Sequence, residues 1–323
     1  MTVTLLTSQS EPTATDADAL ITGVFQGPDG PVLTLSTDEI DLMAALTALG
    51  ATGKAEEITK IPTAGLAGGS GGVVPPARHR LATPVIVAVG LGPEPGAADA
   101  EPAKRRAYLE RLRRASGAAT RDLTSGLPGI LGRTNRIAIA LPAGEPDEAE
   151  AVALGGLLGS YAFRKYRTTT STLGDIEQIV YTAHQDAARR ARILADAMTL
   201  VRDLVNTAPA DMVPADLAAV AEQAAAAHGL SVQVLGENEL AKEGFGGILA
   251  VGMGSAHPPR LVRLEYTHPD AVRTVVFAGK GITFDSGGLS LKPPKSMETM
   301  KSDMGGAAAT LAATAAIAEL GLP

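Results

Sequence analysis

Short apolar runs alternate with longer helical stretches along this chain, and that alternation constrains its fold more than any other feature of the sequence. The pattern predicts strands at Ala19–Phe25, Pro84–Gly90, Arg136–Leu141, Ile176–Tyr181, Ser231–Leu235, Leu261–Tyr266 and Thr274–Ala278. It predicts helices at Thr37–Leu49, Ala103–Leu123, Glu148–Tyr161, Gln185–Val205, Ala215–His228 and Met304–Leu320. Strands separated by helices are typical of the α/β class, so we expect an α/β fold.

The length predicts more than one domain. A chain of 323 residues suggests about two domains, at roughly 100–200 residues each. We expect an N-terminal α/β domain at residues 1–170, a connecting strand and long helix at 171–202, and a second α/β domain at 203–323. The glycine-rich stretch Gly65–Gly72 is predicted to be a surface linker, because no strand–loop–helix unit frames it for phosphate binding.

The charge and composition exclude several classes of protein. With 28 Lys and Arg against 35 Asp and Glu, the formal net charge is −7, which argues against broad binding to nucleic-acid phosphates. The helix predicted at Ala103–Leu123 has a basic face, but its acidic neighbours favour a solvated face over a nucleic-acid surface. The sequence has no cysteine, so disulfides, thiolate zinc sites, iron–sulfur clusters and cysteine nucleophiles are excluded.

Nothing in the sequence predicts a membrane protein or a secreted one. No segment approaches the roughly 18 uninterrupted apolar residues of a membrane-spanning helix. Residues 1–16 lack a basic region followed by a continuous apolar run, so we expect no secretory signal. We therefore expect a cytoplasmic protein without a membrane partner.

The most reactive side chains follow the last predicted strand. One glycine-rich segment holds Lys280, Asp285, Lys292, Lys301 and Asp303 within a short stretch of chain. The carboxyl edge of a parallel sheet is where ligands bind in open α/β folds, and glycines allow the unusual turns that gather side chains there. We therefore expect the functional site in this segment.

Common motifs do not account for the segment. A phosphate-binding P-loop fails, because Thr274 stands where its first glycine belongs and Gly281 follows Lys280. A nucleophile elbow fails, because Phe284 stands two residues before Ser286, where glycine belongs. A pair of glycosidase carboxylates stays open, but it would leave the lysines without a role.

A site for two divalent metal ions uses most of these charges. Asp285 and Asp303 offer the oxygen ligands that such ions prefer. Two cations repel a nearby ammonium, so Lys280 could bind as a neutral ligand while Lys292 stays protonated and polarises a substrate carbonyl. Simpler interpretations remain open: Asp303 could cap the helix that follows it, and the lysines could be exposed loop residues, as we assume for Lys301.

The same segment resembles a known family. Gly279–Gly288 (GKGITFDSGG), Leu289–Pro293 (LSLKP) and Met300–Ala308 (MKSDMGGAA) are similar to motifs of the leucyl aminopeptidases, also called cytosol aminopeptidases. Arg202–Pro209 (RDLVNTAP) and Leu249–Val262 (LAVGMGSAHPPRLV) agree as well. The resemblance is strong from about residue 201 onward, whereas residues 1–170 match only in layout.

The resemblance implies a fold and an activity. The fold would be an N-terminal α/β domain of the macro-like kind plus an incomplete C-terminal α/β metallopeptidase domain with a mixed, mostly buried sheet. Residues 203–323 would be the N-terminal portion of that catalytic domain. The activity would be that of a homohexameric aminopeptidase, which releases N-terminal residues, Leu preferred, from peptides with two divalent metal ions, Mn or Zn.

The resemblance also implies roles for individual residues. Lys280, Asp285 and Asp303 would be metal ligands, with Asp285 shared by both ions. Lys292 would be the catalytic lysine that binds the scissile carbonyl and stabilises the developing oxyanion. Met300 would line the pocket for the substrate's first side chain, with core packing as the alternative.

The sequence departs from the family in one respect. The family's second motif, Asn-Thr-Asp-Ala-Glu-Gly-Arg, which supplies two more carboxylates and an arginine, does not occur in it. Asp285 and Asp303 would face two dications alone, so further anionic ligands are needed. The helix predicted at Met304–Leu320 carries one charge and should be buried on most sides. We therefore expect this chain to be part of a longer enzyme, whose C-terminal segment would be its partner. Without that segment we expect the chain to be inactive.

A second function stays open beside the enzyme. The chain could be a catalytically incomplete fragment or degenerate homologue that acts as a binding or assembly module. Asp285, Lys292 and Asp303 are all present. A decayed site would be expected to lose charges that are costly to cluster, so their presence favours the enzyme.

Overall fold

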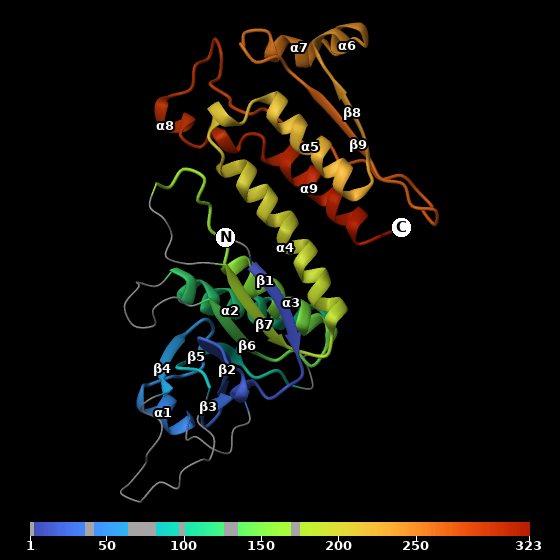
Figure 1. Ribbon diagram of the computed structural model, residues 1–323. Coiled ribbons are helices and arrows are strands. Elements are labelled where there is room, and N and C mark those ends of the chain that lie inside the picture. Colours follow the sequence, from blue (N-terminus) through green and yellow to red (C-terminus); the bar gives the residue numbers. More distant parts are fainter. Residues whose placement is uncertain (1–2, 36–41, 64–81, 97–100, 126–134, 169–174) are drawn as a thin grey trace, which may run out of the picture. The chain divides into compact units, whose positions relative to one another are not determined.

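The computed structural model (Figure 1) describes residues 3–35, 42–63, 82–96, 101–125, 135–168 and 175–323. The chain forms two compact units. The first contains Met1–Ala162 and Arg167–Arg192, and the second contains Phe163–Tyr166 and Ile193–Pro323. The domain limits expected at residues 170 and 202 stay a prediction.

Two of the predicted features fall wholly or partly outside the described residues. The start of the helix predicted from Thr37 and the linker predicted at Gly65–Gly72 lie outside the described residues. The later part of that helix is described as α1 (Leu42–Ala48), and Gly50 follows it with a positive φ of 74°. This is the backbone conformation expected of a glycine that ends a helix.

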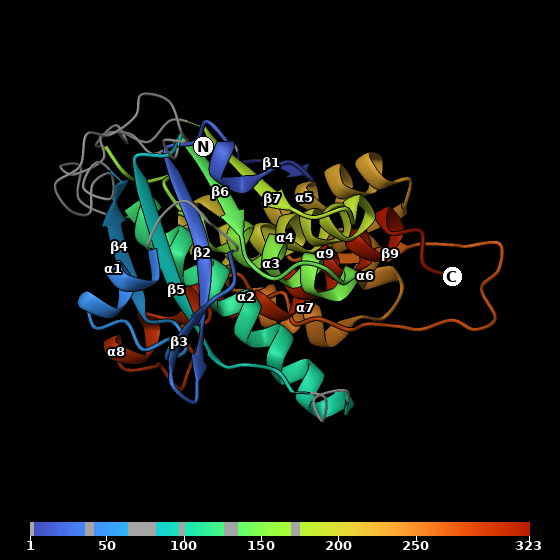
Figure 2. The ribbon, with the colours of Figure 1, turned by 90° about the horizontal axis from the view of Figure 1, so that it is seen from below.

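The described part of the first unit is built on one mixed sheet. Its strands have the order β1-β7-β6-β2-β5-β4, with β3 paired to β2. From β1 through β7, β6 and β2 to β5, each strand runs parallel to the next. β4 is antiparallel to β5, and β3 is antiparallel to β2. Figure 2 shows β5, β2, β6 and β7 side by side. The strands are β1 (Val3–Ser8), β2 (Ala19–Gly27), β3 (Gly30–Leu33), β4 (Ile58–Pro62), β5 (Val85–Pro93), β6 (Arg136–Ala140) and β7 (Ile176–Tyr181). The predicted α/β class is confirmed.

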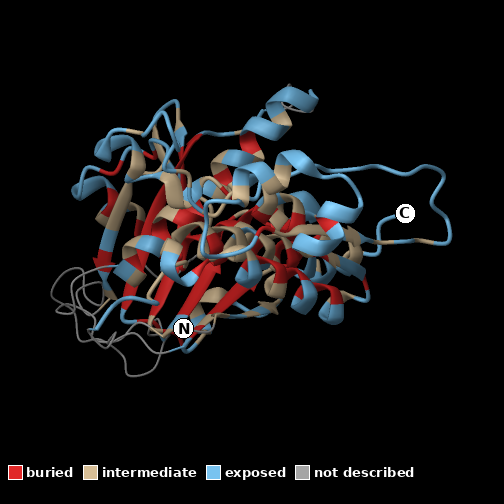
Figure 3. Cartoon of the chain, turned by 90° about the horizontal axis from the view of Figure 1, so that it is seen from above, coloured by how far each residue is buried: buried red, intermediate tan, exposed pale blue. Residues whose placement is uncertain are grey.

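Helices cover both faces of this sheet. The alternation of side chains along β5 sends Val87 and Val89 into one core, and Ile86 and Ala88 into another. The first core is closed by α2 (Pro102–Ser125), α3 (Pro146–Gly159) and the beginning of α4 (Gln185–Asn206), and the second by α1. Figure 3 shows the resulting band of buried residues along the strands. Burial on both faces explains why the central strands read as continuous apolar runs.

The strands that the sequence analysis missed lie at the margins of the sheet. β2, β5, β6 and β7 confirm four predicted strands, whereas β1, β3 and β4 were not expected. β1 is an end strand in which partly exposed residues alternate with exposed ones, and β4 is the strand at the other end. Their apolar runs are therefore short and interrupted, which weakens the signal in the sequence.

The basic face of α2 is balanced by acidic side chains. Arg105 pairs with Asp147 and, at 3.0 Å, with Glu148. Arg113 and Arg114 pair with Glu110 and Glu56. A face whose arginines are paired within the protein is a poor phosphate-binding surface, so the structure lends no support to the nucleic-acid interpretation.

The second unit consists mostly of helices. α4 packs with α5 (Pro214–His228) and α9 (Gly305–Glu319), and their contacts join Leu204, Leu217 and Met304 in one core. β8 (Ser231–Leu235) and β9 (Leu261–Glu265) form an antiparallel pair and confirm two predicted strands. The remaining helices are α6 (Glu237–Lys242), α7 (Gly246–Gly252) and α8 (Pro294–Met297). A mixed, mostly buried sheet was expected here, whereas the sheet found among the described residues of this unit is this antiparallel pair, whose residues are mostly exposed or partly exposed.

The strand predicted at Thr274–Ala278 is not formed. Val275, Val276 and Phe277 are 61%, 83% and 55% exposed, and the segment has no strand beside it. A strand needs a neighbour for its backbone hydrogen bonds, and an apolar run without one has no reason to be a strand. The strand predicted from this apolar run was therefore wrong.

The burial of α9 also differs from expectation. Ala308, Leu311 and Ala315 face the interior of the unit, whereas Ala309 and Ala313 are exposed. The helix therefore buries one face rather than most of its surface.

No helix in the described part of the chain is both long and apolar enough to cross a membrane.

Candidate functional site

Gly279 and Gly306 bring the segment from Lys280 to Asp303, here called the charged segment, against the start of α9. A side chain at Gly279 would place its Cβ 2.5 Å from the carbonyl oxygen of Gly306 and 2.6 Å from the hydroxyl of Thr310. At this close approach the amide of Ala307 donates a 2.9 Å hydrogen bond to the carbonyl of Lys280. The backbone that carries Lys280 is therefore fixed to the helix that Asp303 precedes.

Lys280 and Asp303 form an ion pair across this contact. The Nζ atom of Lys280 donates to Oδ1 of Asp303 at 2.8 Å. This hydrogen bond raises the pKa of Lys280 above its ordinary value. The second carboxylate oxygen, Oδ2 of Asp303, is buried and has no hydrogen-bond partner among the described residues. A buried carboxylate oxygen without a donor is costly, and it is a candidate to bind a cation.

Asp303 is not the helix cap that the sequence left open. It ends a short 3₁₀ turn (Met300–Ser302), and the residue that caps α9 is Met304, with no side-chain hydrogen bond to the helix. The side chain of Asp303 instead accepts a hydrogen bond from Lys280. The capping interpretation was therefore wrong.

Asp285 and Lys292 form a second ion pair within a tight turn. The Nζ atom of Lys292 lies 3.0 Å from Oδ2 of Asp285, whose Oδ1 accepts a 2.8 Å hydrogen bond from the amide of Gly287. The amide of Lys292 donates to the carbonyl of Ser286 at 2.9 Å and closes the turn. The hydrogen bonds from Lys292 and Gly287 lower the pKa of Asp285.

Gly287 is required for this turn. Its φ is 96°, and a Cβ there would lie 2.3 Å from the carbonyl oxygen of Ser290. We expect Gly287→Ala to open the turn, because a left-handed conformation costs about 1–2 kcal/mol for a residue with a side chain and the collision adds to it. Hydrogen exchange of the Lys292 amide should become at least about tenfold faster.

Gly288→Ala is the matched control for this substitution. Gly288 also has a positive φ, of 75°, but a Cβ added to it would have no atom within 4 Å. It should accelerate exchange of the same amide by less than Gly287→Ala does. Equal effects of the two substitutions would contradict a role for the close contact with Ser290.

Lys301 has a partner that the sequence analysis did not expect. Its Nζ atom lies 3.5 Å from the side-chain oxygen of Asn206, at the end of α4. Lys301 is partly buried rather than an exposed loop residue. Asn206 lies in the stretch RDLVNTAP, so the motif itself was the signal for this contact. Met300 begins the 3₁₀ turn and is neither fully buried nor fully exposed.

The two ion pairs are close enough to influence each other. The negative charge of Asp285 contributes to the raised pKa of Lys280, and the positive charge of Lys280 contributes to the lowered pKa of Asp285. The described residues contain no group of three His, Cys, Asp or Glu side chains that could hold a metal ion by themselves. Two carboxylates, one with a free buried oxygen, fit a divalent cation in donor type but supply only part of a coordination sphere.

The similarity to known proteins extends over nearly the whole chain. Residues 199–323 match the model of the cytosol aminopeptidase family, catalytic domain. The chain is 43% identical to a probable cytosol aminopeptidase of Streptomyces griseus, over 95% of this chain and 59% of that protein. A probable cytosol aminopeptidase of Micrococcus luteus is 41% identical over 95% of this chain and 58% of its own length. The chain thus spans a little under three fifths of these relatives.

Solved structures agree with the sequence comparison. The bottromycin maturation enzyme BotP in complex with Mn is similar with a TM-score of 0.72 and 30% identity, over 95% of this chain and 57% of that one. The cytosol aminopeptidase from Coxiella burnetii is similar with a TM-score of 0.67 and 26% identity, over 99% of this chain and 58% of that one. The segment that holds the motifs therefore matches the catalytic domain of the cytosol aminopeptidase family, and the whole chain is similar to part of probable cytosol aminopeptidases.

Proposed function

We propose that this chain is part of a metal-dependent aminopeptidase that releases N-terminal residues from peptides. The observation that carries the proposal is the pair of lysine–carboxylate contacts, Lys280 with Asp303 and Lys292 with Asp285, joined by electrostatic coupling at the start of α9. The names of the relatives support an aminopeptidase, and the solved complex of BotP with Mn supports a divalent metal ion.

Asp285, Asp303 and Lys280 are the residues that would hold two divalent ions, Mn or Zn, with Asp285 between them. Bound there, such ions supply Lewis acidity and an acidified water molecule. The free Oδ2 atom of Asp303 supports this assignment, since a carboxylate in a partly buried position gains a partner on binding a cation. Lys280 would have to give up its proton and its contact with Asp303 to become a ligand.

Lys292 would act on the substrate. Its ammonium is held by Asp285 at 3.0 Å, and a cation that takes over this carboxylate would leave Lys292 free to donate to the scissile carbonyl. A donor placed where negative charge develops stabilises the transition state more than the bound substrate. Met300 would contact the first side chain of the substrate, and an apolar contact there would favour Leu.

The remaining ligands would come from another polypeptide segment. Asp285 and Asp303 supply two negative charges against the four positive charges of two dications, so the site needs more carboxylates than these. Val275, Val276 and Phe277 are 61%, 83% and 55% exposed, and such a run of exposed apolar side chains is typical of a surface that a partner covers. We further propose a cytosolic location, peptide substrates and a hexameric assembly, as the family suggests.

Metal binding and hydrolysis of leucyl-p-nitroanilide test the proposal. We expect the chain to bind Mn²⁺, measured by electron paramagnetic resonance of the free ion, and Asp303→Asn to weaken this binding by more than about tenfold. Glu298→Gln removes an exposed carboxylate from the same segment and should leave binding unchanged. We expect hydrolysis only when the chain is co-expressed with the part of the S. griseus relative that has no counterpart in it.

Two results would overturn the proposal. One is Mn²⁺ binding that Asp303→Asn and Glu298→Gln weaken equally. The other is a co-expressed complex that forms and binds Mn²⁺ but releases no p-nitroaniline. The second result would favour a binding or assembly module, for which the exposed apolar run is the supporting observation.

A further inference from the structure

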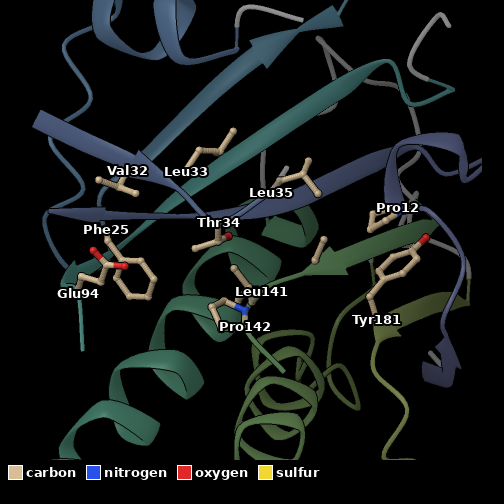
Figure 4. Close-up of a pocket in the computed structure, with 11 residues that line it drawn as sticks. Pro12, Phe25, Val32, Leu33, Thr34, Leu35, Glu94, Leu141, Pro142 and Tyr181 are labelled. Carbon is tan, nitrogen blue, oxygen red and sulfur yellow. The ribbon is translucent and has the colours of Figure 1, made fainter. Parts of the chain in front are cut away.

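A groove of about 410 Å³ lies in the first unit, far along the sequence from the charged segment (Figure 4). It is lined where parallel strands end: Phe25 near the end of β2, Glu94 just after β5, Leu141 just after β6, and Tyr181 at the end of β7. The carboxyl edge of a parallel sheet is the usual place for a ligand in open α/β folds. The volume is within the range of small-molecule sites, about 300–1,000 Å³.

The walls of the groove are mainly apolar. Among the described lining residues, the polar side-chain groups are the hydroxyls of Thr34 and Tyr181 and the carboxylate of Glu94. The Thr34 hydroxyl accepts a 3.1 Å hydrogen bond from the amide of Gly23 and donates one of 3.1 Å to the carbonyl of Gly23. The Tyr181 hydroxyl is hydrogen-bonded to the hydroxyl of Thr15. No hydrogen bond or ion pair of the Glu94 carboxylate is seen within the described residues. Glu94 is therefore the polar group that a ligand can use.

The placement of Glu94 selects the charge of the ligand. Figure 4 shows Glu94 beside the ring of Phe25 at one end of the groove, with Tyr181 and Pro12 at the other. A carboxylate next to an aromatic ring attracts an ammonium group. No Lys, Arg or His is among the described residues that line the groove, so phosphates and carboxylates would find no cation in this lining to balance the charge of Glu94.

We propose that this groove binds a small ammonium compound with an apolar chain, its charge at Glu94 and its chain along Leu33 and Leu141. The compound can be a free amine or the N-terminal residue of a short apolar peptide, since both present the same ammonium and side chain. The site is separate from the charged segment of the second unit, and it does not rest on the proposed peptidase activity.

Calorimetric titration of the full chain with 3-methylbutylamine tests the site. EDTA in the buffer keeps the measurement independent of metal and turnover. We expect the amine to bind at least tenfold more tightly than 3-methylbutanol, and 3-methylbutanoate not to bind. Glu94→Gln should weaken amine binding about tenfold, which is about 1.4 kcal/mol, and should leave the alcohol unaffected. Glu101→Gln, an exposed carboxylate before α2, is the matched control.

A second variant separates loss of the site from loss of the fold. Val32 lines the groove and is 38% exposed, so Val32→Trp should fill the groove while the thermal unfolding midpoint stays near that of the unmodified chain. Binding of both amine and alcohol should then be lost. A Leu-Leu peptide that binds with the same dependence on Glu94 identifies a peptide N-terminus as ligand, and a peptide that does not bind identifies a free amine. Equal affinity for amine and alcohol, or amine binding unchanged by Glu94→Gln, would overturn the proposal.

Discussion

Replacing Lys292 by alanine is expected to lower kcat for leucyl-p-nitroanilide by about 10²–10³-fold, in the chain co-expressed with the unmatched part of the S. griseus relative. Removing one donor from a developing oxyanion costs about 3–4 kcal/mol of transition-state stabilisation. The donor acts on charge that appears only in the transition state, so KM should change by far less than kcat. Steady-state kinetics with Mn²⁺ in excess measure both constants.

Lys295→Ala is the control for this substitution. Lys295 lies three residues further along the chain and is exposed. It should leave kcat and KM unchanged. If Lys292→Ala raised KM and left kcat intact, Lys292 would bind substrate without stabilising charge. Equal losses for the two lysines would show a general electrostatic effect of the segment instead of a specific contact.

Replacing Gly155 by alanine is expected to destabilise the first unit by about 3 kcal/mol, at the upper end of overpacking effects. Gly155 lies where α3 crosses α2, and a Cβ there would be 2.1 Å from the carbonyl oxygen of Arg113 and 2.9 Å from Cβ of Ser116. Alanine would favour the helix itself by up to about 1 kcal/mol. The collision decides the sign, because a backbone carbonyl inside a helix cannot move away as a flexible side chain can.

Urea denaturation followed by circular dichroism measures this loss. Gly144→Ala is the matched control, since Gly144 is exposed just before α3 and the nearest atom to its added Cβ is 3.9 Å away. It should change the free energy of unfolding by less than about 0.5 kcal/mol. A Gly155→Ala chain as stable as the unmodified chain would mean that α2 and α3 can separate without cost.

The first unit was the more predictable part of the chain. Val87 and Val89 lie in a strand buried on both faces, and such a strand leaves a continuous apolar run that composition can detect. The run Val275–Phe277 looks the same in the sequence, yet it is exposed and forms no strand. The difference lies in whether a neighbouring strand is present, and local composition carries no information about that.

The sequence named the charged residues of the candidate site but not the pairs that they form. Lys280, Asp285, Lys292 and Asp303 could be named from their types and spacing. Their partners could not, because Lys280 meets Asp303 only after a glycine contact brings the segment against α9. The same contact removed the simpler interpretation of Asp303 as a helix cap.

The sequence by itself determined the α/β class, four central strands of the first sheet, the main helices and the family, because each depends on patterns within short stretches of chain. Only the tertiary structure decided the strand order β1-β7-β6-β2-β5-β4, the two ion pairs and the groove beside Glu94. These depend on contacts between residues far apart in the sequence. Such contacts are selected by packing and hydrogen bonding of the whole unit, which no local pattern records.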